Sequence, residues 1–200
     1  MKKLISLLLF AGSLSCNAKE RLAILPPELV NGKISQTEIY SEFSSIFHTE
    51  ILGKIAGSSQ FDLVSRKRVQ DLVSEQEFSK SGFVSKKDAP KLGKLLGASH
   101  ICFLEITKLD QKNIESNFPG TTEILIKEKV AASCSLTIAE TETGNILYAR
   151  VHSDQKEQLT GRKNQGLNIE SKDKGLQISE VAKRMGGKVG ISILRSLKPP

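Results

Sequence analysis

Tryptophan is absent from the 200-residue sequence, and tyrosine occurs only twice. These are the residues that form the aromatic girdles around membrane-spanning strands, so the sequence supplies few of them. After the first sixteen residues there is also no apolar run of the roughly 20 residues that a membrane-spanning helix needs. We therefore expect no transmembrane helix in the remainder of the chain.

The motifs of several enzyme classes are missing as well. His48, His100 and His152 are far apart and show no metal-binding spacing such as H-E-x-x-H. The sequence has neither a G-x-x-x-x-G-K-[ST] phosphate loop nor a G-x-S-x-G nucleophile elbow. Cys102 lies in an apolar run, a poor setting for a reactive thiolate. We therefore predict no catalytic residue, no metal ligand and no cofactor, and we do not expect an enzyme.

The N-terminus has the order of a secretory signal. Two lysines precede an apolar run at residues 4–10, and small residues follow. Two processing sites fit this order: lipidation of Cys16, which would become the new N-terminus, or cleavage after Ala18. We predict a signal peptide at residues 1–18 and a periplasmic protein, anchored to the outer membrane if Cys16 carries lipid.

The sequence is basic, with a formal net charge of +7 that becomes +5 when Lys2 and Lys3 leave with the signal. An exported protein rarely meets nucleic acid, so we expect no nucleic-acid partner. An anionic membrane or polymer could use this charge. The lysines are scattered along the chain, however, and this pattern is also that of a solvated basic surface.

A separate question is whether Cys102 and Cys134 form a disulfide. Both lie in apolar, strand-like runs. An oxidising compartment permits a disulfide between them, whereas two strand cysteines can equally be buried free thiols. The sequence leaves both alternatives open.

Hydrophobic patterning predicts an α/β fold of the α+β type at residues 19–200, built on a mixed sheet of about five to six strands. Predicted strands lie at 21–25, 61–65, 100–109, 130–140 and 146–152, and residues 122–127 are a further strand candidate. A long N-terminal helix follows the capping box of Ser35 and Glu38 and ends near Gly57. Two short central helices and a closing helix complete the fold; they are expected around residues 69–73, from 87 or 88 to 97, and at 176–197.

Two polar stretches are predicted to be connections. Residues 110–120 are expected to form a loop. Residues 156–174 are expected to be mobile or to form a contact loop, because unstructured connections of this length are uncommon in compact domains. The cations of that candidate contact loop are Lys156, Arg162, Lys163, Lys172 and Lys174.

A family pattern runs through the centre of the sequence: an arginine after a strand, a helix carrying leucine and Glu-Gln, a Ser-Gly break, then a helix whose Gly-Lys-x-x-Gly-Ala leads into a strand. The matching positions are Arg66, Leu72, Glu75, Gln76, Ser81, Gly82, Gly93, Lys94, Gly97 and Ala98, and a later strand pair turns on Thr143 and Gly144. In these residues the chain resembles the CsgG family, the curli production assembly and transport components. The resemblance implies a fold more than a chemistry, because most of these positions suit helix ends, breaks and turns.

The departures from the family concern the pore. The curli channel has two long hairpins per subunit that join into a transmembrane barrel. The corresponding segments here are residues 109–130, whose strand-like part lacks aromatic residues, and 156–174, which is polar. The stretch corresponding to the channel's constriction loop, PPELVNGKIS, has no aromatic residue either. We therefore expect a CsgG-like fold without the pore-forming hairpins, a broad fold that lipoproteins resembling LpoB share.

The resemblance implies a non-catalytic adaptor or assembly factor of the cell envelope that binds protein partners. A homo-oligomer, in which the partners are further copies of the chain, is also compatible with it. Two alternatives remain open at this point. The chain could be an oligomeric subunit of a curli-like secretion channel, or a periplasmic binder of an anionic polymer that uses residues 156–174.

Overall fold

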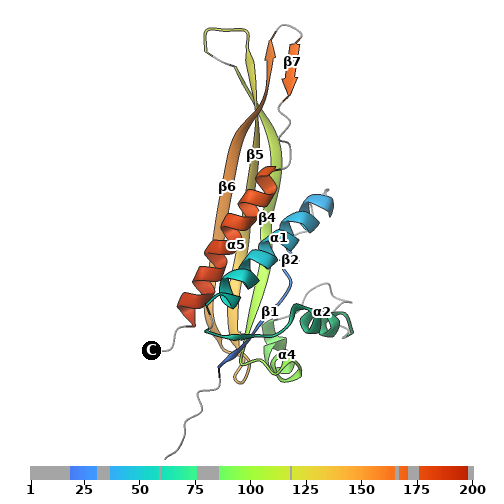
Figure 1. The fold of residues 1–200 in the computed structure, drawn as a ribbon, viewed down its shortest axis with the longest axis vertical. Coiled ribbons are helices and arrows are strands. Elements are labelled where there is room, and N and C mark those ends of the chain that lie inside the picture. The colour runs from blue at the N-terminus through green and yellow to red at the C-terminus, as the bar shows by residue number, and fades with distance from the viewer. Residues whose placement is uncertain are drawn as a thin grey trace, which may run out of the picture.

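A computed structural model describes residues 19–30, 37–58, 60–75, 86–117, 119–164, 167–170 and 176–197. The predicted fold class is confirmed: one mixed sheet carries helices on both faces (Figure 1). Within these residues no helix is both long enough and apolar enough to cross a membrane.

The sheet has seven strands in the described residues, two of them only two residues long. They are β1 (Arg21–Ile24), β2 (Glu28–Leu29), β3 (Asp62–Leu63), β4 (His100–Asn117), β5 (Ile124–Glu140), β6 (Ile146–Asn164) and β7 (Leu167–Glu170). The order is β3-β1-β4-β5-β6-β7, with β2 beside β4. β1 runs parallel to β3 and β4, whereas β4 to β7 form an antiparallel meander.

The helices follow the predicted plan of one long helix, two short ones and a closing one. They are α1 (Thr37–Ala56), α2 (Arg66–Glu75), a short 3-10 turn η1 (Lys86–Asp88), α4 (Ala89–Leu96) and α5 (Leu176–Ser196). Pro90 stands in the first turn of α4, where its missing N–H costs no hydrogen bond. The predicted capping serine of α1, Ser35, lies outside the described residues.

Two apolar layers hold the helices to the sheet. α1 and α5 bury side chains of one sheet face, and the stacked rings of Phe43 and Phe47, with centroids 5.6 Å apart, lie in that layer. A smaller layer beneath α2 and α4 covers the lower end of the opposite face and contains Leu92, Leu96 and Phe103. The upper part of that second face has no described helix over it (Figure 1).

α1 and α5 cross closely because α5 carries glycines at the contact. A Cβ on Gly186 would lie 2.8 Å from the Phe47 carbonyl oxygen, and one on Gly190 would lie 2.9 Å from Lys54 Cβ. From the sequence alone, glycines in the interior of a helix are expected only to weaken it. In the fold, two of them provide the space that the backbone of α1 occupies.

The two predicted loops are wrong in most of their length. β4 continues through residues 110–117 and pairs with β5 from His100 opposite Glu140 to Asn117 opposite Ile124, with one register shift between Ile106 and Lys108. β6 continues to Asn164, and residues 167–170 return beside it as β7. An antiparallel ladder is made by backbone N–H and C=O groups, so polar side chains do not prevent it. The strand candidate at 122–127 is confirmed as the start of β5. As a result, the sheet extends well beyond the helices at its upper end (Figure 1).

Candidate binding surfaces

The pattern positions on α4 lie at one junction, close to the turn that carries the last two positions. Gly93 of α4 lies against Thr141, which follows β5, so closely that a Cβ on Gly93 would be 2.2 Å from Thr141 Cβ. The Thr141 hydroxyl donates a hydrogen bond to the Ala98 carbonyl at 2.6 Å. The α4 part of the pattern therefore contacts Thr141, which lies just before the Thr143-Gly144 turn of the same pattern.

Two glycines shape this junction through positive φ angles. Gly97 ends α4 with φ 62°, and the N–H of Ala98 donates to the Gly93 carbonyl at 3.0 Å. Gly144 has φ 76° in the turn before β6, where a Cβ would lie 3.2 Å from Pro90 Cγ. Thr143 donates to the Glu140 carboxylate at 2.6 Å in the same turn.

The remaining pattern positions are more scattered. Arg66 begins α2, and Leu72 packs on the layer beneath it. Glu75 is the last residue of α2. Outside the described residues lie Cys16, Gln76, Ser81, Gly82, Lys172 and Lys174.

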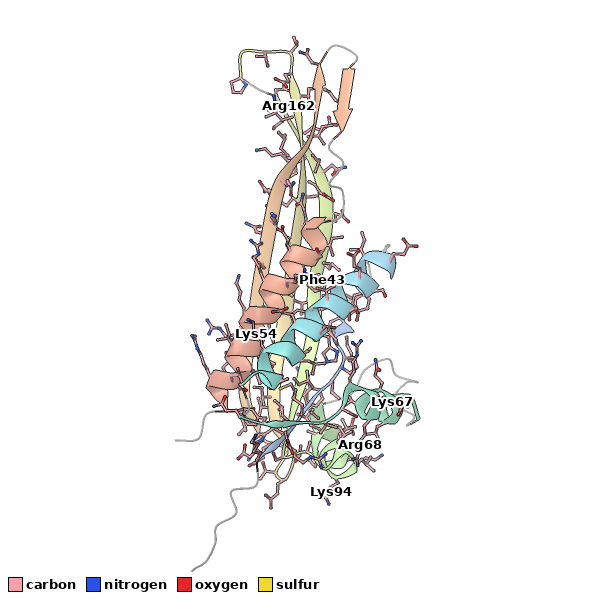
Figure 2. All side chains as sticks on the ribbon, in the orientation of Figure 1. Phe43, Lys54, Lys67, Arg68, Lys94 and Arg162 are labelled. Carbon is pink, nitrogen blue, oxygen red and sulfur yellow. The ribbon has the colours of Figure 1, made fainter. Side chains whose placement is uncertain are left out.

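Three cations predicted for a contact loop, Lys156, Arg162 and Lys163, stand instead on β6, and each of them meets a carboxylate. Lys156 pairs with Glu180 of α5. Arg162, labelled near the upper end in Figure 2, lies 3.5 Å from Glu123, and Lys163 lies 2.7 Å from Glu115. These pairs reduce the charge that this surface offers to an anion.

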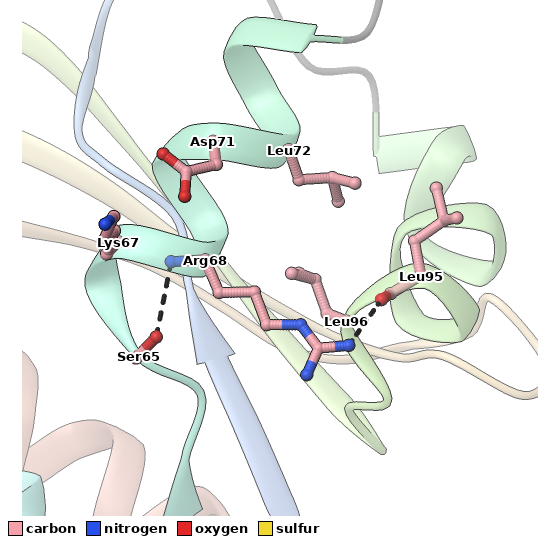
Figure 3. Close-up of a pocket in the computed structure, with 7 residues that line it drawn as sticks. All are labelled: Ser65, Lys67, Arg68, Asp71, Leu72, Leu95 and Leu96. Atoms are coloured by element: carbon pink, nitrogen blue, oxygen red, sulfur yellow. Dashed lines mark hydrogen bonds between the residues drawn. The ribbon is translucent and has the colours of Figure 1, made fainter.

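An open hollow of about 280 Å³ lies between α2 and α4 (Figure 3). Its lining consists of Ser65, Lys67, Arg68, Asp71, Leu72, Leu95 and Leu96. Arg68 spans the two helices, because its guanidinium donates to the Leu95 carbonyl at 3.2 Å. Pockets for small ligands are usually larger, roughly 300–1,000 Å³, and more enclosed. The hollow is therefore a helix junction with a polar rim.

The outer edge of β6 is the longest unpaired edge among the described strands. β5 pairs with one side of β6, and β7 pairs with the other side only at residues 161–164. Residues 146–160 have no described strand on that outer side. The register with β5 is continuous over residues 148–159, without a bulge. At Gln155 the backbone N–H donates to Asp154 Oδ1 at 2.9 Å, and the backbone carbonyl accepts from Arg184 at 3.0 Å. On either side of Gln155 the edge presents backbone donors and acceptors that can pair with a further strand.

Apolar side chains are exposed along the same strand. Val151 is 61% exposed, Ile146 57% and Leu147 48%. Edge strands are commonly protected by proline, by bulges, by charged side chains or by being short. Residues 148–159 contain no proline and no bulge, and their charged residues are Arg150, Asp154, Lys156 and Glu157. Exposed aliphatic side chains on an unpaired strand are typical of a contact surface.

Cations flank this edge on the side of the sheet that α5 covers. Arg184 Nε lies 3.1 Å from one Asp154 oxygen, and Lys188 Nζ lies 3.5 Å from the other. Arg150 is four residues before Asp154 in β6, and its side chain is exposed on the same side of the sheet. Arg184 and Lys188 thus share the single carboxylate of Asp154, and Arg150 adds a third cation nearby. We call these four residues the basic margin, because it carries excess positive charge.

His152 lies within this positive region. Partial burial lowers the pKa of its imidazole, and the charges of Arg150 and Lys188 lower it further. Its Nε2 atom is buried and makes no hydrogen bond within the described residues. The ring is therefore neutral near pH 7 and is a reporter of any negative charge that binds there.

The basic margin was not predicted from the sequence, although the spacing of charged residues in α5 and in β6 indicates it. Glu180, Arg184 and Lys188 recur every four residues, which places them on one side of α5. Residues 150, 152, 154 and 156 alternate along β6, which places them on one face of the strand. What the spacings lack is the contact between the two elements.

The thiols and the other histidines have no ligand arrangement around them. Cys102 and Cys134 are both buried and free, and burial raises the pKa of the Cys134 thiol to about 12. The described ranges contain no group of three or more His, Cys, Asp or Glu side chains that could hold a metal ion.

Comparison with solved structures finds the same fold at low identity. A neuraminyllactose-binding hemagglutinin homolog from Helicobacter pylori aligns with TM-score 0.53 and 11% identity, over 90% of this chain and 86% of that chain. Lipoprotein GNA1162 from Neisseria meningitidis aligns with TM-score 0.50 and 8% identity, over 89% and 97%. The LpoB C-terminal domain from Salmonella enterica aligns at a lower TM-score of 0.41 and 13% identity, over 70% of this chain and 84% of that chain, which does not by itself show a shared fold.

No curated protein sequence matches the chain. A family model does, over residues 35–170, which is more than half of the sequence and includes the whole pattern from Arg66 to Gly144. The resemblance drawn from those residues is thereby confirmed. The chain belongs to the CsgG family, described as the curli production assembly/transport component.

Proposed function

We propose that this protein is an exported, non-catalytic component of the cell envelope that binds protein partners, as an adaptor or assembly factor. Membership of the CsgG family supports a role in envelope assembly. The signal-like order of residues 1–18 supports export, and Cys16 is the residue that would carry a lipid anchor.

One observation carries the binding role: the long unpaired edge of β6 with exposed Val151 beside it. A strand edge and an aliphatic patch together offer backbone hydrogen bonds and apolar area to another protein. A catalytic role has no comparable support. Both thiols are buried, and His100, whose Nδ1 lies 3.1 Å from the Ser99 hydroxyl and 3.4 Å from the Glu20 carboxylate, does not line the hollow between α2 and α4.

Export and anchoring are tested by expressing the full chain in a bacterial host, separating the membranes and measuring intact mass. We expect a lipid-sized mass increase in the membrane fraction that Cys16→Ala abolishes. A soluble protein with the mass expected from cleavage after Ala18 would contradict the anchor and leave a periplasmic binding protein.

Partner binding is tested with a photo-crosslinking residue placed at Val151 in cells that make the protein. We expect a discrete adduct with an envelope protein, identified by mass spectrometry. Leu95 on α4, another exposed aliphatic residue at 40% exposure, provides the control position. Equal or absent adducts at the two positions would contradict a binding role for this edge.

A secretion-channel subunit is the second candidate, because the β4–β5 and β6–β7 pairs extend beyond the helices (Figure 1). Charged residues on these strands, such as Asp110, Lys112 and Glu115, argue against contact with lipid. The test is labelling of Arg162→Cys in proteoliposomes with a water-soluble maleimide. Insertion predicts protection of the thiol, whereas full labelling rejects the channel.

Binding of an anionic polymer is the third candidate and depends on the cations between residues 156 and 174. Neutralising Lys156, Arg162, Lys163, Lys172 and Lys174 together should then weaken retention on an anionic resin. Unchanged retention would reject this candidate.

A further inference from the structure

We propose that the outer edge of β6, residues 148–159, binds an extended acidic segment of a partner protein as an additional β-strand. This inference rests on the proposed function, since it names the chemistry of the partner. The backbone of β6, the side chains on its two faces and the cations of α5 together favour such a partner.

The backbone of β6 is suited to accept a strand. It keeps one register with β5 over residues 148–159, from Tyr148 opposite Ile138 to Leu159 opposite Lys127. Twelve residues without a bulge exceed the usual strand length of five or six residues. A peptide laid along this edge would gain main-chain hydrogen bonds, which give affinity without requiring a particular sequence. At Gln155 it would displace the Asp154 and Arg184 side chains, which bond the N–H and carbonyl of that residue.

The two faces of β6 select different side chains. On the face turned away from α5, Ala149, Val151 and Ser153 are uncharged, and further along Glu157 pairs with Lys129 of β5 at 2.9 Å. On the face beneath α5 stand Arg150 and Lys156, beside Arg184 and Lys188 of the helix. Side chains of an added strand would alternate between these two environments.

The resulting preference is for alternating residues. Aliphatic side chains at every second position would cover Val151, which is 61% exposed. Carboxylates at the positions between them would face Arg150 and Lys188. Directly opposed side chains on paired strands lie about 4.5–5.5 Å apart, which is close enough for charge pairing.

A second copy of this chain fits the edge less well. Symmetric pairing of two β6 edges would bring Arg184 and Lys188 of both copies to one seam, and like charges there repel. An acidic segment of another protein does not meet this repulsion. Head-to-tail pairing with the outer edge of β4, which has no described strand beside residues 107–117, is the form of self-association that sedimentation would detect.

The experiment measures binding of a synthetic ten-residue peptide that alternates glutamate and valine to the folded chain carrying Cys16→Ala. We expect saturable binding that weakens with added salt, together with slower amide hydrogen exchange in residues 148–159. We also expect the pKa of His152 to rise on binding, because a carboxylate would offset the charges of Arg150 and Lys188.

Two control peptides separate strand pairing from simple charge attraction. Proline in place of the two central valines removes backbone donors, so this peptide should bind at least tenfold more weakly. Lysine in place of glutamate should abolish binding. Equal binding of the proline peptide would overturn the strand-pairing proposal and leave only a charged surface.

A double variant, Arg150→Gln with Lys188→Gln, should weaken binding of the acidic peptide by about tenfold. The matched control is Lys67→Gln with Lys94→Gln, which removes the same charge from α2 and α4 (Figure 2). Thermal melting checks that both variants fold. Equal affinities of the two variants would overturn the assignment of the site.

The outcome for this inference is separable from that for the proposed function. If the acidic peptide does not bind but the crosslink at Val151 still forms, the edge binds a partner of another chemistry and only this inference fails. If dimerisation through β6 appears in sedimentation instead, the occupant is a second copy, and the acidic segment is rejected.

Discussion

Gly93 and Thr141 are in contact at a distance that no larger residue in place of the glycine could tolerate. A Cβ on Gly93 would lie 2.2 Å from Thr141 Cβ and 2.5 Å from its methyl carbon. Gly93 is 48 residues before Thr141, and the contact joins α4 to the turn between β5 and β6. Part of the family pattern is therefore explained by this packing.

Gly93→Ala should accordingly destabilise the protein by about 1–3 kcal/mol, the usual cost of overpacking. Gly53→Ala is the control, because Gly53 is also in a helix but has nothing within 4 Å of its Cβ position. That change should be neutral or stabilise by up to about 1 kcal/mol. Urea unfolding measures both, and a stable Gly93→Ala variant would show that the contact can relax.

The glycines of α5 permit a comparison within one helix. Gly186→Ala and Gly190→Ala should each destabilise the protein, because the new methyl groups meet the backbone of Phe47 and Cβ of Lys54 at under 3 Å. Gly187→Ala should instead stabilise α5 by about 0.5–1 kcal/mol, since its nearest neighbour is 3.8 Å away. Thermal melts that rank all three variants equally would contradict close helix contact.

His48 should make the stability depend on pH. The side chain is 1% exposed, and burial, followed by the charge of Arg66, lowers its pKa from 6.5 to about 4, although the Ile24 backbone raises it slightly. The unfolded state therefore binds the proton more tightly. The stability that neutral, buried His48 contributes is fully present above pH 6.5. It is lost as the pH falls toward 4, by up to about 3 kcal/mol.

The check is the free energy of unfolding of the parent chain and of His48→Leu between pH 7 and pH 4. Neither ring nitrogen of His48 makes a hydrogen bond of normal geometry in the described residues, so leucine should be tolerated. We expect the parent to lose stability more steeply on acidification. Parallel curves for the two proteins would show that His48 does not carry this dependence.

The thiols should be unreactive in the native state. Burial raises the pKa of Cys102 and Cys134 strongly, which leaves almost no thiolate at neutral pH. In the Cys16→Ala chain, a thiol reagent should titrate no cysteine without denaturant and two in concentrated urea. Fast reaction of either thiol in the native protein would indicate an opening of the core.

Several elements followed from the sequence because their residues carry a period. The helical spacing of Ile39, Phe43, Ile46 and Phe47 predicts α1, and the apolar runs at 100–109 and 130–140 predict the lower parts of β4 and β5. Gly97 and Thr143-Gly144 were expected at a helix end and a turn, and positive φ angles at Gly97 and Gly144 are found there. These are local properties, set within a few residues.

The tertiary structure decided what local properties do not contain. Polar residues 110–117 and 156–164 form strands because the neighbouring strands supply backbone hydrogen-bond partners, and no apolar period records this. Gly186 and Gly190 acquire a role only when α1 lies against them. Likewise, one basic surface forms from Arg150, Arg184 and Lys188 only when α5 packs beside β6. These residues are far apart in the sequence, and only the folded chain brings their charges close enough to act together.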